Sequence, residues 1–268
     1  MTLACLQQNI LWEQPDANRR HVEETFAHIG GDADILIVPE TFTTGFSDNM
    51  AALAEDPEGP TLVWARKMAA QHNALFVGTW TVRQDAVVYN RLHWVYPDGT
   101  YGYYDKAHTF RMSSEASQIA RGTRRVTFTW RGWRIRPAVC YDLRFPLWLR
   151  NEMQQSLLDY DLLILCANWP QSRHEAWSTL LRARAIENLC YTVGCNRVGT
   201  DGVGIPYSGD SAIVDFRGTD VATCTPDSEE LAVATLNRQA LDTFRSHWPF
   251  HLDADPMPPF FTHTTNDN

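Results

Sequence analysis

The sequence predicts a single α/β domain. Apolar runs typical of buried strands alternate with helical segments along almost all of the 268 residues. Hydrophobic residues make up 44% of the chain, which is enough for one sizeable core. No Pro- or Ser-rich linker and no internal repeat divides the chain, so we expect one domain over 1–261 and a polar C-terminal tail over 262–268. Helices separated by pairs of strands predict layers, with sheets buried on one face and covered by helices on the other.

The first half of the chain alternates strands and helices before a run of strands. Asp16 can cap the first helix, and Gly30-Gly31 is expected to end it. Pro60 suits the first turn of the second helix, and Pro97-Asp98-Gly99 forms a turn between two strands. The predicted elements are, in order, a strand at 3–8, a helix between 16 and 30, a strand at 35–38, a helix at 60–73, and strands at 75–81, 87–96 and 101–104.

The second half begins with a long loop and is then dominated by strands around one long helix. The loop is predicted from 105 to about 124, and a hairpin then folds around Arg131-Gly132. The second strand of the hairpin ends at Val139-Cys140. The remaining predicted elements are a strand at 162–167, a helix at 175–189, strands at 191–195, 211–215, 222–225 and 231–236, and a helix at 239–245.

The charge balance argues against nucleic-acid and membrane partners. The formal net charge is −9 and the pI is about 5.4, whereas neutralising phosphate groups requires clustered Lys and Arg. The most basic run, 121–136, alternates with apolar residues and predicts a strand pair with solvated edges. No stretch reaches the roughly 18 continuous apolar residues of a membrane span, and the N-terminus lacks the pattern of a signal peptide. We therefore expect a cytoplasmic protein.

The six cysteines show no CxxC pair and no regular spacing. In a chain without export signals we expect reduced thiols rather than a disulfide framework. Cys166, Cys190 and Cys195 lie in or beside apolar strands and are expected to be inert core residues. A metal site is not predicted, because neither His108 nor any other histidine forms a short zinc-type spacing with cysteines.

Three segments place a reactive side chain at the carboxyl end of an apolar strand, where open α/β sheets bind ligands. These side chains are Glu40, Lys106 and Cys140. Taken singly, each residue type is more common in a structural role, as a solvated carboxylate, a surface cation or a small core residue. Taken together they are complementary, because a thiol nucleophile needs a base and a tetrahedral intermediate needs a cationic partner. A neighbouring ammonium is expected to favour the charged forms of both the carboxylate and the thiol.

These segments resemble the Glu-Lys-Cys triad of the carbon-nitrogen hydrolase (nitrilase) superfamily, and the resemblance covers nearly the whole chain. The matching motifs are Pro39-Glu40, Tyr104-x-Lys106-x-His108, Cys140-Tyr-Asp-x-Arg-Phe-Pro146, and the segment from Leu181 to Asn188 after the loop Asn168-Trp169-Pro170. The resemblance implies a single-domain four-layer α-β-β-α sandwich of the nitrilase type. It also implies a homodimer or higher homo-oligomer that pairs through its outer faces, and an active site with no metal or organic cofactor.

The resemblance assigns roles to the reactive residues. Glu40 is the general base, Cys140 is the nucleophile, and Lys106 with the backbone N–H of Tyr141 stabilises the oxyanion. Glu115 matches a second glutamate that family members commonly carry in the loop after the lysine. Whether Glu115 is catalytic, positions Lys106 or the substrate, or is a solvated loop residue stays open from sequence.

The substrate branch that this sequence most resembles is that of the bacterial omega-amidases. These enzymes hydrolyse the terminal amide of 2-oxoglutaramate or 2-oxosuccinamate, giving the 2-oxo acid and ammonia. Such a small-molecule substrate needs a cation in the pocket, and Arg144 and Arg173 are the candidates, because a guanidinium binds a carboxylate in a bidentate fork. A structural salt bridge is the alternative for Arg144. Three aromatic residues are expected to form the pocket wall, with the core as their alternative: Phe42, Phe110 and Trp169.

Other functions remain open at this stage. A deaminated-glutathione amidase, or another small-molecule amidase or nitrilase of the same superfamily, uses the same three residue types. Acyl transfer to an amine instead of water leaves no trace in the sequence. A catalytically dead binding or scaffold protein on the same fold would be expected to lack one member of the triad, and none is missing.

Overall fold

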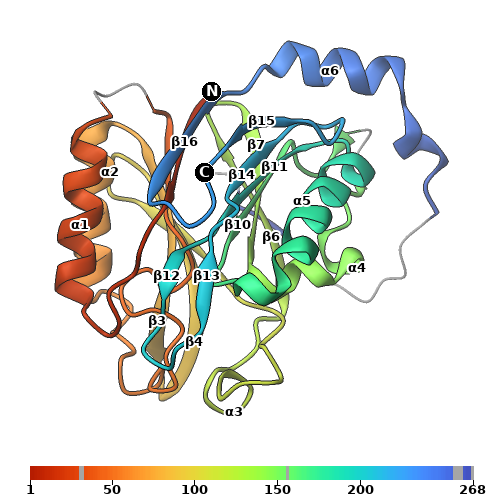
Figure 1. The fold of residues 1–268 in the computed structure, drawn as a ribbon. Coiled ribbons are helices and arrows are strands. Elements are labelled where there is room, and N and C mark those ends of the chain that lie inside the picture. Colours follow the sequence, from red (N-terminus) through yellow and green to blue (C-terminus); the bar gives the residue numbers. More distant parts are fainter. Residues whose placement is uncertain (30–32, 155–156, 256–261, 267–268) are drawn as a thin grey trace.

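The computed structural model describes residues 1–29, 33–154, 157–255 and 262–266. Two mixed sheets pack face to face, and helices cover their outer faces (Figure 1). Helices α1 (Pro15–Ala27) and α2 (Pro60–His72) lie on one side, and α5 (His174–Asn188) with the short α4 (Pro146–Leu149) lies on the other. This is the four-layer α-β-β-α sandwich that the sequence predicts.

The first sheet has six strands in the order β16-β1-β2-β3-β4-β5. Parallel pairing joins β1, β2 and β3, whereas β4 and β5 follow as an antiparallel meander and β16 pairs antiparallel with β1. The strand bounds are β1 Thr2–Gln7, β2 Ile35–Ile37, β3 Leu75–Gln84, β4 Val87–Val95, β5 Tyr101–Asp105 and β16 Glu230–Thr235.

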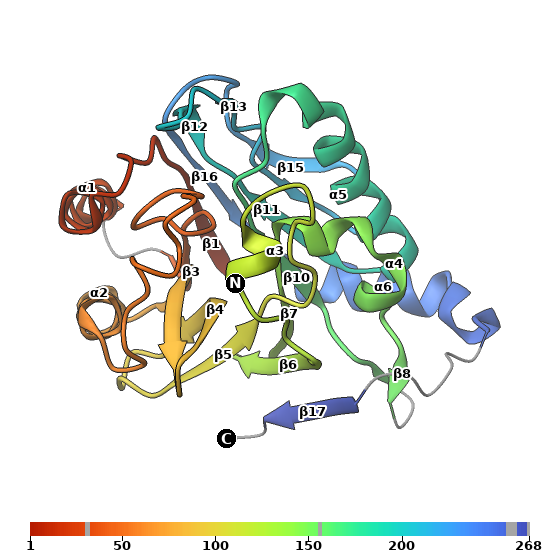
Figure 2. The same ribbon diagram turned by 90° about the horizontal axis from the view of Figure 1, so that it is seen from below.

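The second sheet has seven strands in the order β15-β14-β11-β10-β7-β6-β17. Its centre is parallel, because β7, β10 and β11 run in the same direction. The predicted polar tail, 262–268, contains strand β17. This strand pairs in parallel with β6 at the edge of the sheet (Figure 2). The strand bounds are β6 Arg124–Trp130, β7 Trp133–Val139, β10 Leu162–Cys166, β11 Tyr191–Cys195, β14 Ala212–Val214, β15 Asp220–Thr223 and β17 Thr262–Asn266.

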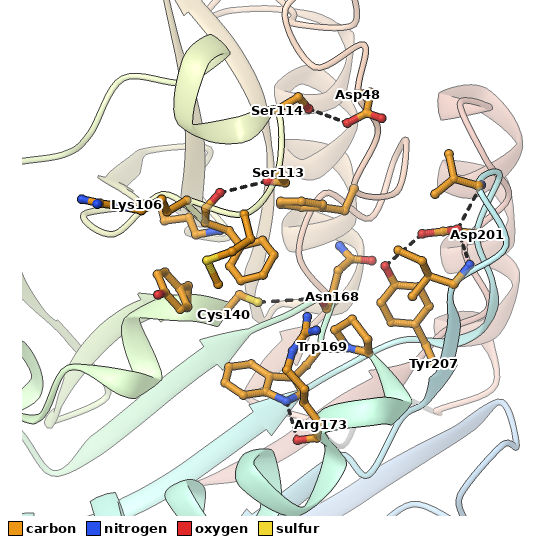
Figure 3. Close-up of a pocket in the computed structure, with 18 of the residues that line it drawn as sticks. Asp48, Lys106, Ser113, Ser114, Cys140, Asn168, Trp169, Arg173, Asp201 and Tyr207 are labelled. Atoms are coloured by element: carbon orange, nitrogen blue, oxygen red, sulfur yellow. Dashed lines mark hydrogen bonds between the residues drawn. The ribbon is translucent and has the colours of Figure 1, made fainter.

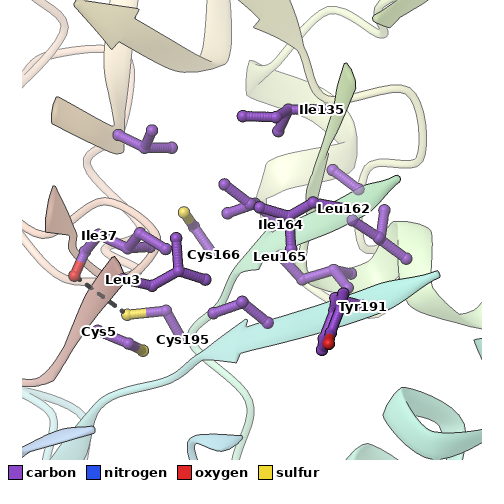
Figure 4. Packing of buried hydrophobic residues seen from close by; sticks show 14 of the residues in the cluster. Leu3, Cys5, Ile37, Ile135, Leu162, Ile164, Leu165, Cys166, Tyr191 and Cys195 are labelled. Atoms are coloured by element: carbon purple, nitrogen blue, oxygen red, sulfur yellow. Dashed lines mark hydrogen bonds between the residues drawn. The ribbon is translucent and has the colours of Figure 1, made fainter. Parts of the chain in front are cut away.

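The main core fills the space between the two sheets. Figure 4 shows Leu3 and Ile37 of the first sheet near Ile164 of the second, and all three side chains are fully buried. Every residue of β10 is buried, because one face of the strand meets the opposite sheet and the other meets the helical layer. Each such aliphatic side chain contributes about 1.5–3 kcal/mol to folding when it is fully buried.

Several short elements were not predicted. They are α3 Glu115–Gln118 inside the expected loop, the one-turn helix η1 Cys140–Arg144, the hairpins β8 Met153–Gln154 with β9 Leu157–Leu158 and β12 Val198–Thr200 with β13 Pro206–Ser208, and the turns η2 Gln171–Arg173 and η3 Phe250–Asp253. Two- and three-residue strands are too short to show a periodicity of their own. The last helix, α6 (Arg238–His247), extends the predicted one at both ends.

One local expectation is wrong, and another lies outside the described residues. Helix α1 begins at Pro15 with Gln14 at the cap position and no side-chain cap, so Asp16 lies in its first turn and pairs with Arg19 instead. The expected stop at Gly30-Gly31 includes residues outside the described part of the chain.

The basic run 121–136 was expected to form a strand pair with solvated edges, but some of its arginines are buried. Arg125 and Arg136 are each 2% exposed, and they pair with Glu152 and Asp159. Each carboxylate offsets the cost of burying the arginine charge. Within the described residues, none of the helices is both long and apolar enough to cross a membrane.

Candidate active site

The reactive residues predicted from sequence converge beside one cavity. Glu40 follows β2, Lys106 follows β5 and Cys140 follows β7, while Glu115 opens α3. The cavity has a volume of about 770 Å³, and both Lys106 and Cys140 line it. Figure 3 shows the Cys140 sulfur pointing toward Asn168, whose backbone oxygen accepts the thiol hydrogen bond at 3.8 Å.

Two residues of the site have strained backbones. Cys140, directly after β7, has φ of +44°, and Thr41 beside Glu40 has φ of +42°. This left-handed region is costly for residues other than glycine, and it persists only where surrounding contacts enforce it. At Thr41, the backbone N–H donates to the Thr79 hydroxyl at 2.7 Å, and the Asn168 side-chain amide donates to the Thr41 hydroxyl at 2.9 Å.

Lys106 forms the centre of a completely buried ionic cluster. Its ammonium donates to Glu40 Oε1 at 2.8 Å and to both carboxylate oxygens of Glu115 at 2.9 Å. All three side chains are 0% exposed. The backbone N–H of Phe110 donates to Glu115 Oε2 at 2.6 Å. Glu115 is therefore not a solvated loop residue but a second carboxylate partner of the lysine.

Two asparagines complete the surroundings of Glu40. The backbone N–H of Asn168 donates to Glu40 Oε2 at 2.8 Å, and the side-chain amide of Asn90 donates to Glu40 Oε1 at 2.8 Å. Asn168 lies in the loop that the sequence analysis singled out, whereas Asn90 was missed. No signal in the sequence set Asn90 apart, because the predicted strand 87–96 also contains the polar residues Arg91 and His93.

Burial outweighs the effect that the sequence predicts for the Lys106 ammonium on the pKa values of the site. Desolvation raises the pKa of Glu40, Lys106 acts against this rise, and the Glu115 charge adds to it. The pKa of the Cys140 thiol is raised well above its usual value, by burial first and then by the Glu40 charge, and the Lys106 ammonium only partly offsets this. Cys140 is therefore a neutral thiol at neutral pH, beside a carboxylate with a raised proton affinity.

Lys106 itself stays an ammonium. Desolvation acts to lower its pKa, but the charges of Glu115 and Glu40 outweigh that effect and raise it. A fixed positive charge beside the nucleophile is what a developing oxyanion requires.

A second buried network joins the lysine segment to the cysteine turn. Asp142 Oδ2 accepts from the Tyr104 hydroxyl at 2.8 Å, and Asp142 Oδ1 lies 2.7 Å from His108 Nδ1. The His108 ring stacks on Phe145 with centroids 3.7 Å apart. His108 thus supports the site and has a carboxylate partner. In the described part of the chain, no group of three or more His, Cys, Asp or Glu side chains is arranged to hold a metal ion.

Four of the five predicted substrate-contacting side chains line the cavity. Phe110, Arg144, Trp169 and Arg173 are all in its wall. Phe42 is not, and that prediction is wrong. Its ring is fully buried in the core between the first sheet and α2, 5.6 Å from the ring of Trp64. The neighbouring Phe46 lines the cavity instead, and its ring lies 5.3 Å from the Lys106 ammonium.

The two arginines lie on aromatic rings of the cavity wall. The Arg144 guanidinium lies 4.8 Å from the centre of the Trp169 ring, and the Arg173 guanidinium lies 5.3 Å from that of Phe110. Within the described residues neither arginine forms an ion pair with a carboxylate, so the structural salt bridge considered for Arg144 is absent there. Both guanidiniums are thus available to an anionic ligand.

The hairpin β12–β13 forms a further wall that sequence did not reveal. Tyr207 and Asp201 line the cavity, and the Tyr207 hydroxyl donates to Asp201 Oδ2 at 3.0 Å. Asp201 also accepts the backbone N–H groups of Val203 and Ile205, which keeps the hairpin loop folded beside the cavity mouth.

Known proteins resemble this chain over most of its length. The model of the carbon-nitrogen hydrolase family matches residues 2–246. The chain is 42% identical over 257 residues to Omega-amidase YafV of Escherichia coli, covering 95% of this chain and 97% of that protein. It is 32% identical over 220 residues to the 2-oxoglutaramate amidase of Bacillus subtilis, with coverages of 81% and 83%.

The comparison of folds gives a similar result. A crystal structure of a carbon-nitrogen hydrolase superfamily protein from Xanthomonas campestris, with an arsenic adduct in its active site, superposes with a TM-score of 0.94. That protein is 42% identical to this chain, and the match covers 96% of this chain and 98% of the other.

Proposed function

The chain belongs to the carbon-nitrogen hydrolase family, and from this we propose that it is a thiol amidohydrolase of the omega-amidase type. It cleaves the terminal amide of 2-oxoglutaramate or 2-oxosuccinamate to the 2-oxo dicarboxylic acid and ammonia. The observation that carries this proposal is the buried Glu40–Lys106–Glu115 cluster beside the Cys140 thiol, next to a cavity whose wall includes Arg144 and Arg173. The named relatives that share most of the chain act on substrates of this class.

The first half of the reaction forms a thioester. Cys140 Sγ attacks the amide carbon while Glu40 accepts the thiol proton, because the raised pKa of the thiol leaves little free thiolate. The Lys106 ammonium and the Tyr141 backbone N–H stabilise the oxyanion. The C–N bond then breaks, and the proton on Glu40 passes to the departing nitrogen, which leaves as ammonia.

The second half hydrolyses the thioester. Glu40, again a carboxylate, removes a proton from water, and the hydroxide attacks the thioester carbon. The C–S bond breaks, the acid product leaves, and the proton on Glu40 returns to Cys140. Glu115 stays bonded to Lys106 throughout and keeps the ammonium oriented between the two carboxylates.

A pH profile tests the role of Glu40 as base. Burial raises the pKa of Glu40 above the ordinary value of 4.5, and the carboxylate is the active form. We therefore expect kcat/KM to fall as the pH decreases through a midpoint above 4.5. The measurement is kcat/KM between pH 4 and 9 in buffers of constant ionic strength. A rate that stays level down to pH 4.5 would contradict the assignment of Glu40 as the base.

Arg144 is the proposed carboxylate contact. Replacing Arg144 with Gln should raise KM for 2-oxoglutaramate by about 10–100-fold, because a hydrogen-bonded charge contact contributes about 1.5–3 kcal/mol. The kcat should change little, since Arg144 does not contact the Glu40–Lys106–Glu115 cluster. An uncharged short-chain amide serves as the control substrate, and its KM should be the same in both proteins. Equal losses for both substrates would show that the variant damages the site in general.

The proposed function is tested by incubating the wild-type protein with 2-oxoglutaramate and measuring ammonia. Deaminated glutathione and an aliphatic nitrile are run in parallel, and hydroxylamine is added to a further sample. Rapid ammonia release from the oxo-amide supports the omega-amidase assignment. Preference for deaminated glutathione or the nitrile would overturn the substrate and keep the family. A hydroxamate as the main product at low hydroxylamine would point to acyl transfer.

The proposal includes a homodimer or higher homo-oligomer that pairs through its outer faces, as the resemblance to the family implies. Sedimentation equilibrium should then give a mass at least twice that of one chain, which is 30.6 kDa. A mass of one chain across the micromolar range would reject the dimer.

A further inference from the structure

Asn90 contacts every charged member of the buried cluster. It lies in β4 with a side chain that is 0% exposed, and it is not part of the cavity wall. Its Nδ2 atom is 2.8 Å from Glu40 Oε1 and 3.1 Å from Glu115 Oε1. Its backbone oxygen accepts the backbone N–H of Lys106 at 2.9 Å. A single residue thus bridges both carboxylates and fixes the start of the lysine segment.

The cluster needs a neutral donor at this place. Two carboxylates share one ammonium in a site without solvent, so their mutual repulsion is weakly screened. The amide nitrogen of asparagine carries two N–H groups and no net charge, and it can therefore satisfy one oxygen of each carboxylate without altering the charge balance.

The amide can adopt only one orientation here. Asn90 Oδ1 is buried and has no hydrogen-bond partner among the described residues. A rotated amide would place this oxygen against two carboxylate oxygens, which is repulsive. The two bonds to Glu40 and Glu115 therefore outweigh the cost of leaving one buried acceptor unsatisfied, which is about 1–3 kcal/mol. Such a cost is tolerated more readily where the residue serves a function.

We infer that Asn90 is a positioning residue that holds Glu40 and Glu115 around Lys106, so that the Glu40 carboxylate stays directed at the Cys140 thiol. For the reaction itself this inference rests on the proposed function. The geometry of base and thiol exists without a substrate, and it can be probed separately.

The charges around Glu40 determine the effect of changing Asn90. Glu40 is faced by Lys106 after β5, Glu115 of α3, Cys140 of η1 and the Cys166 thiol of β10. Asn90→Asp keeps the side-chain shape but replaces the donor with a third carboxylate. The added negative charge favours protonated Glu40 and a protonated thiol. We expect kcat to fall about 10²-fold, as for a displaced general base, with KM changed less than twofold because Asn90 does not line the cavity.

The first experiment compares Asn90→Asp and Asn90→Leu with wild type. Asn90→Leu removes the donor without adding charge. Asn151→Asp is the matched control, since Asn151 is also a buried asparagine, and its amide donates to the backbone oxygens of Tyr160 and Asn188 at 2.8 and 2.9 Å. For each protein we would measure kcat, KM, the pH profile of kcat/KM and the folded fraction by circular dichroism.

The second experiment needs no amide substrate. The rate at which iodoacetamide alkylates Cys140 is followed by mass spectrometry across pH. In both Asn90 variants, Cys140 should be alkylated more slowly than in wild type at neutral pH. In Asn90→Asp, the midpoint of the pH profile of alkylation should move to higher pH. Asn151→Asp should lose stability and keep the wild-type alkylation profile per folded molecule.

The outcomes distinguish the positioning role of Asn90 from the proposed amide substrate. If folded Asn90→Asp or Asn90→Leu keeps the wild-type kcat and alkylation profile, the inference is wrong. It is equally wrong if the losses only follow the folded fraction, as in the Asn151 control. If wild type cleaves none of the amides but the Asn90 variants still shift Cys140 alkylation, the proposed substrate fails while the positioning role stands.

Discussion

Cys140→Ala is expected to abolish ammonia release from any amide that the wild-type protein cleaves. The alanine has no nucleophile, and the thioester cannot form, so turnover should fall by about 10⁴-fold or more. Glu40→Gln should lower turnover by a similar factor, because the glutamine amide cannot take up the thiol proton. The raised pKa of Cys140 leaves too little thiolate for direct attack. The measurement is single-turnover ammonia release at an enzyme concentration above that of the substrate.

The double variant distinguishes a joint mechanism from two separate roles. When two residues act in one step, removing both costs little more than removing either. We therefore expect Cys140→Ala with Glu40→Gln to be no slower than Cys140→Ala alone. Cys195→Ala is the control, since Cys195 is a fully buried core thiol. Wild-type activity in Cys140→Ala would end the proposed mechanism, whereas inactivity of folded Cys195→Ala would show that general core damage mimics the effect.

Asp161→Asn is expected to cause the largest loss of stability. Asp161 is 0% exposed and pairs with three arginines, Arg245 at 2.5 Å, Arg134 at 2.7 Å and Arg238 at 3.0 Å. Arg134 belongs to β7 and the other two to α6, so this carboxylate attaches the last helix to the second sheet. Removing one member of a buried ion pair leaves charge without compensation, and we expect the free energy of unfolding to fall by about 3–5 kcal/mol.

Urea unfolding at pH 7 measures this loss. Asp220→Asn is the control, because the Asp220–Arg182 pair is of similar length, 2.6 Å, but its side chains are 34% and 40% exposed. It should change stability by less than about 1 kcal/mol. Equal effects of the two variants would contradict the argument from burial.

The difference in the free energy of unfolding between wild type and Asp161→Asn should also depend on pH. Burial acts to raise the pKa of Asp161, but its contacts with Arg134 and Arg245 outweigh this and lower it below 3.8. A carboxyl with a lowered pKa contributes its stability above the pKa of the unfolded state and loses it as the pH falls through the folded value. The two proteins should therefore converge in stability below pH 3.8.

The sequence alone predicted the order of the main elements and the candidate reactive residues. Strands such as β10 and β11 are continuous apolar runs, and helices such as α2 carry their own start signal, so neighbouring residues are enough to predict them. Glu40, Lys106 and Cys140 were found for the same reason, because each stands in a short motif directly after a strand.

The tertiary structure decided which of two nearby aromatic residues faces the cavity and which lies in the core. Phe42 and Phe46 belong to one segment, yet only Phe46 lines the cavity, because the packing of α2 against the first sheet encloses Phe42. In the same way, Glu115 was ambiguous in sequence and became a buried partner of Lys106 only when α3 folded against the site.

Protonation and support of the site were also decided only in three dimensions. From sequence, the Lys106 ammonium was expected to favour the charged forms of Glu40 and Cys140, and it does act to lower both pKa values, but complete burial outweighs it and raises them. Asn90 bridges residues 50 positions before it and 25 after it, and no local pattern encodes such a contact. Local patterns depend on residues adjacent in the chain, whereas desolvation and charge coupling depend on residues that come together only on folding.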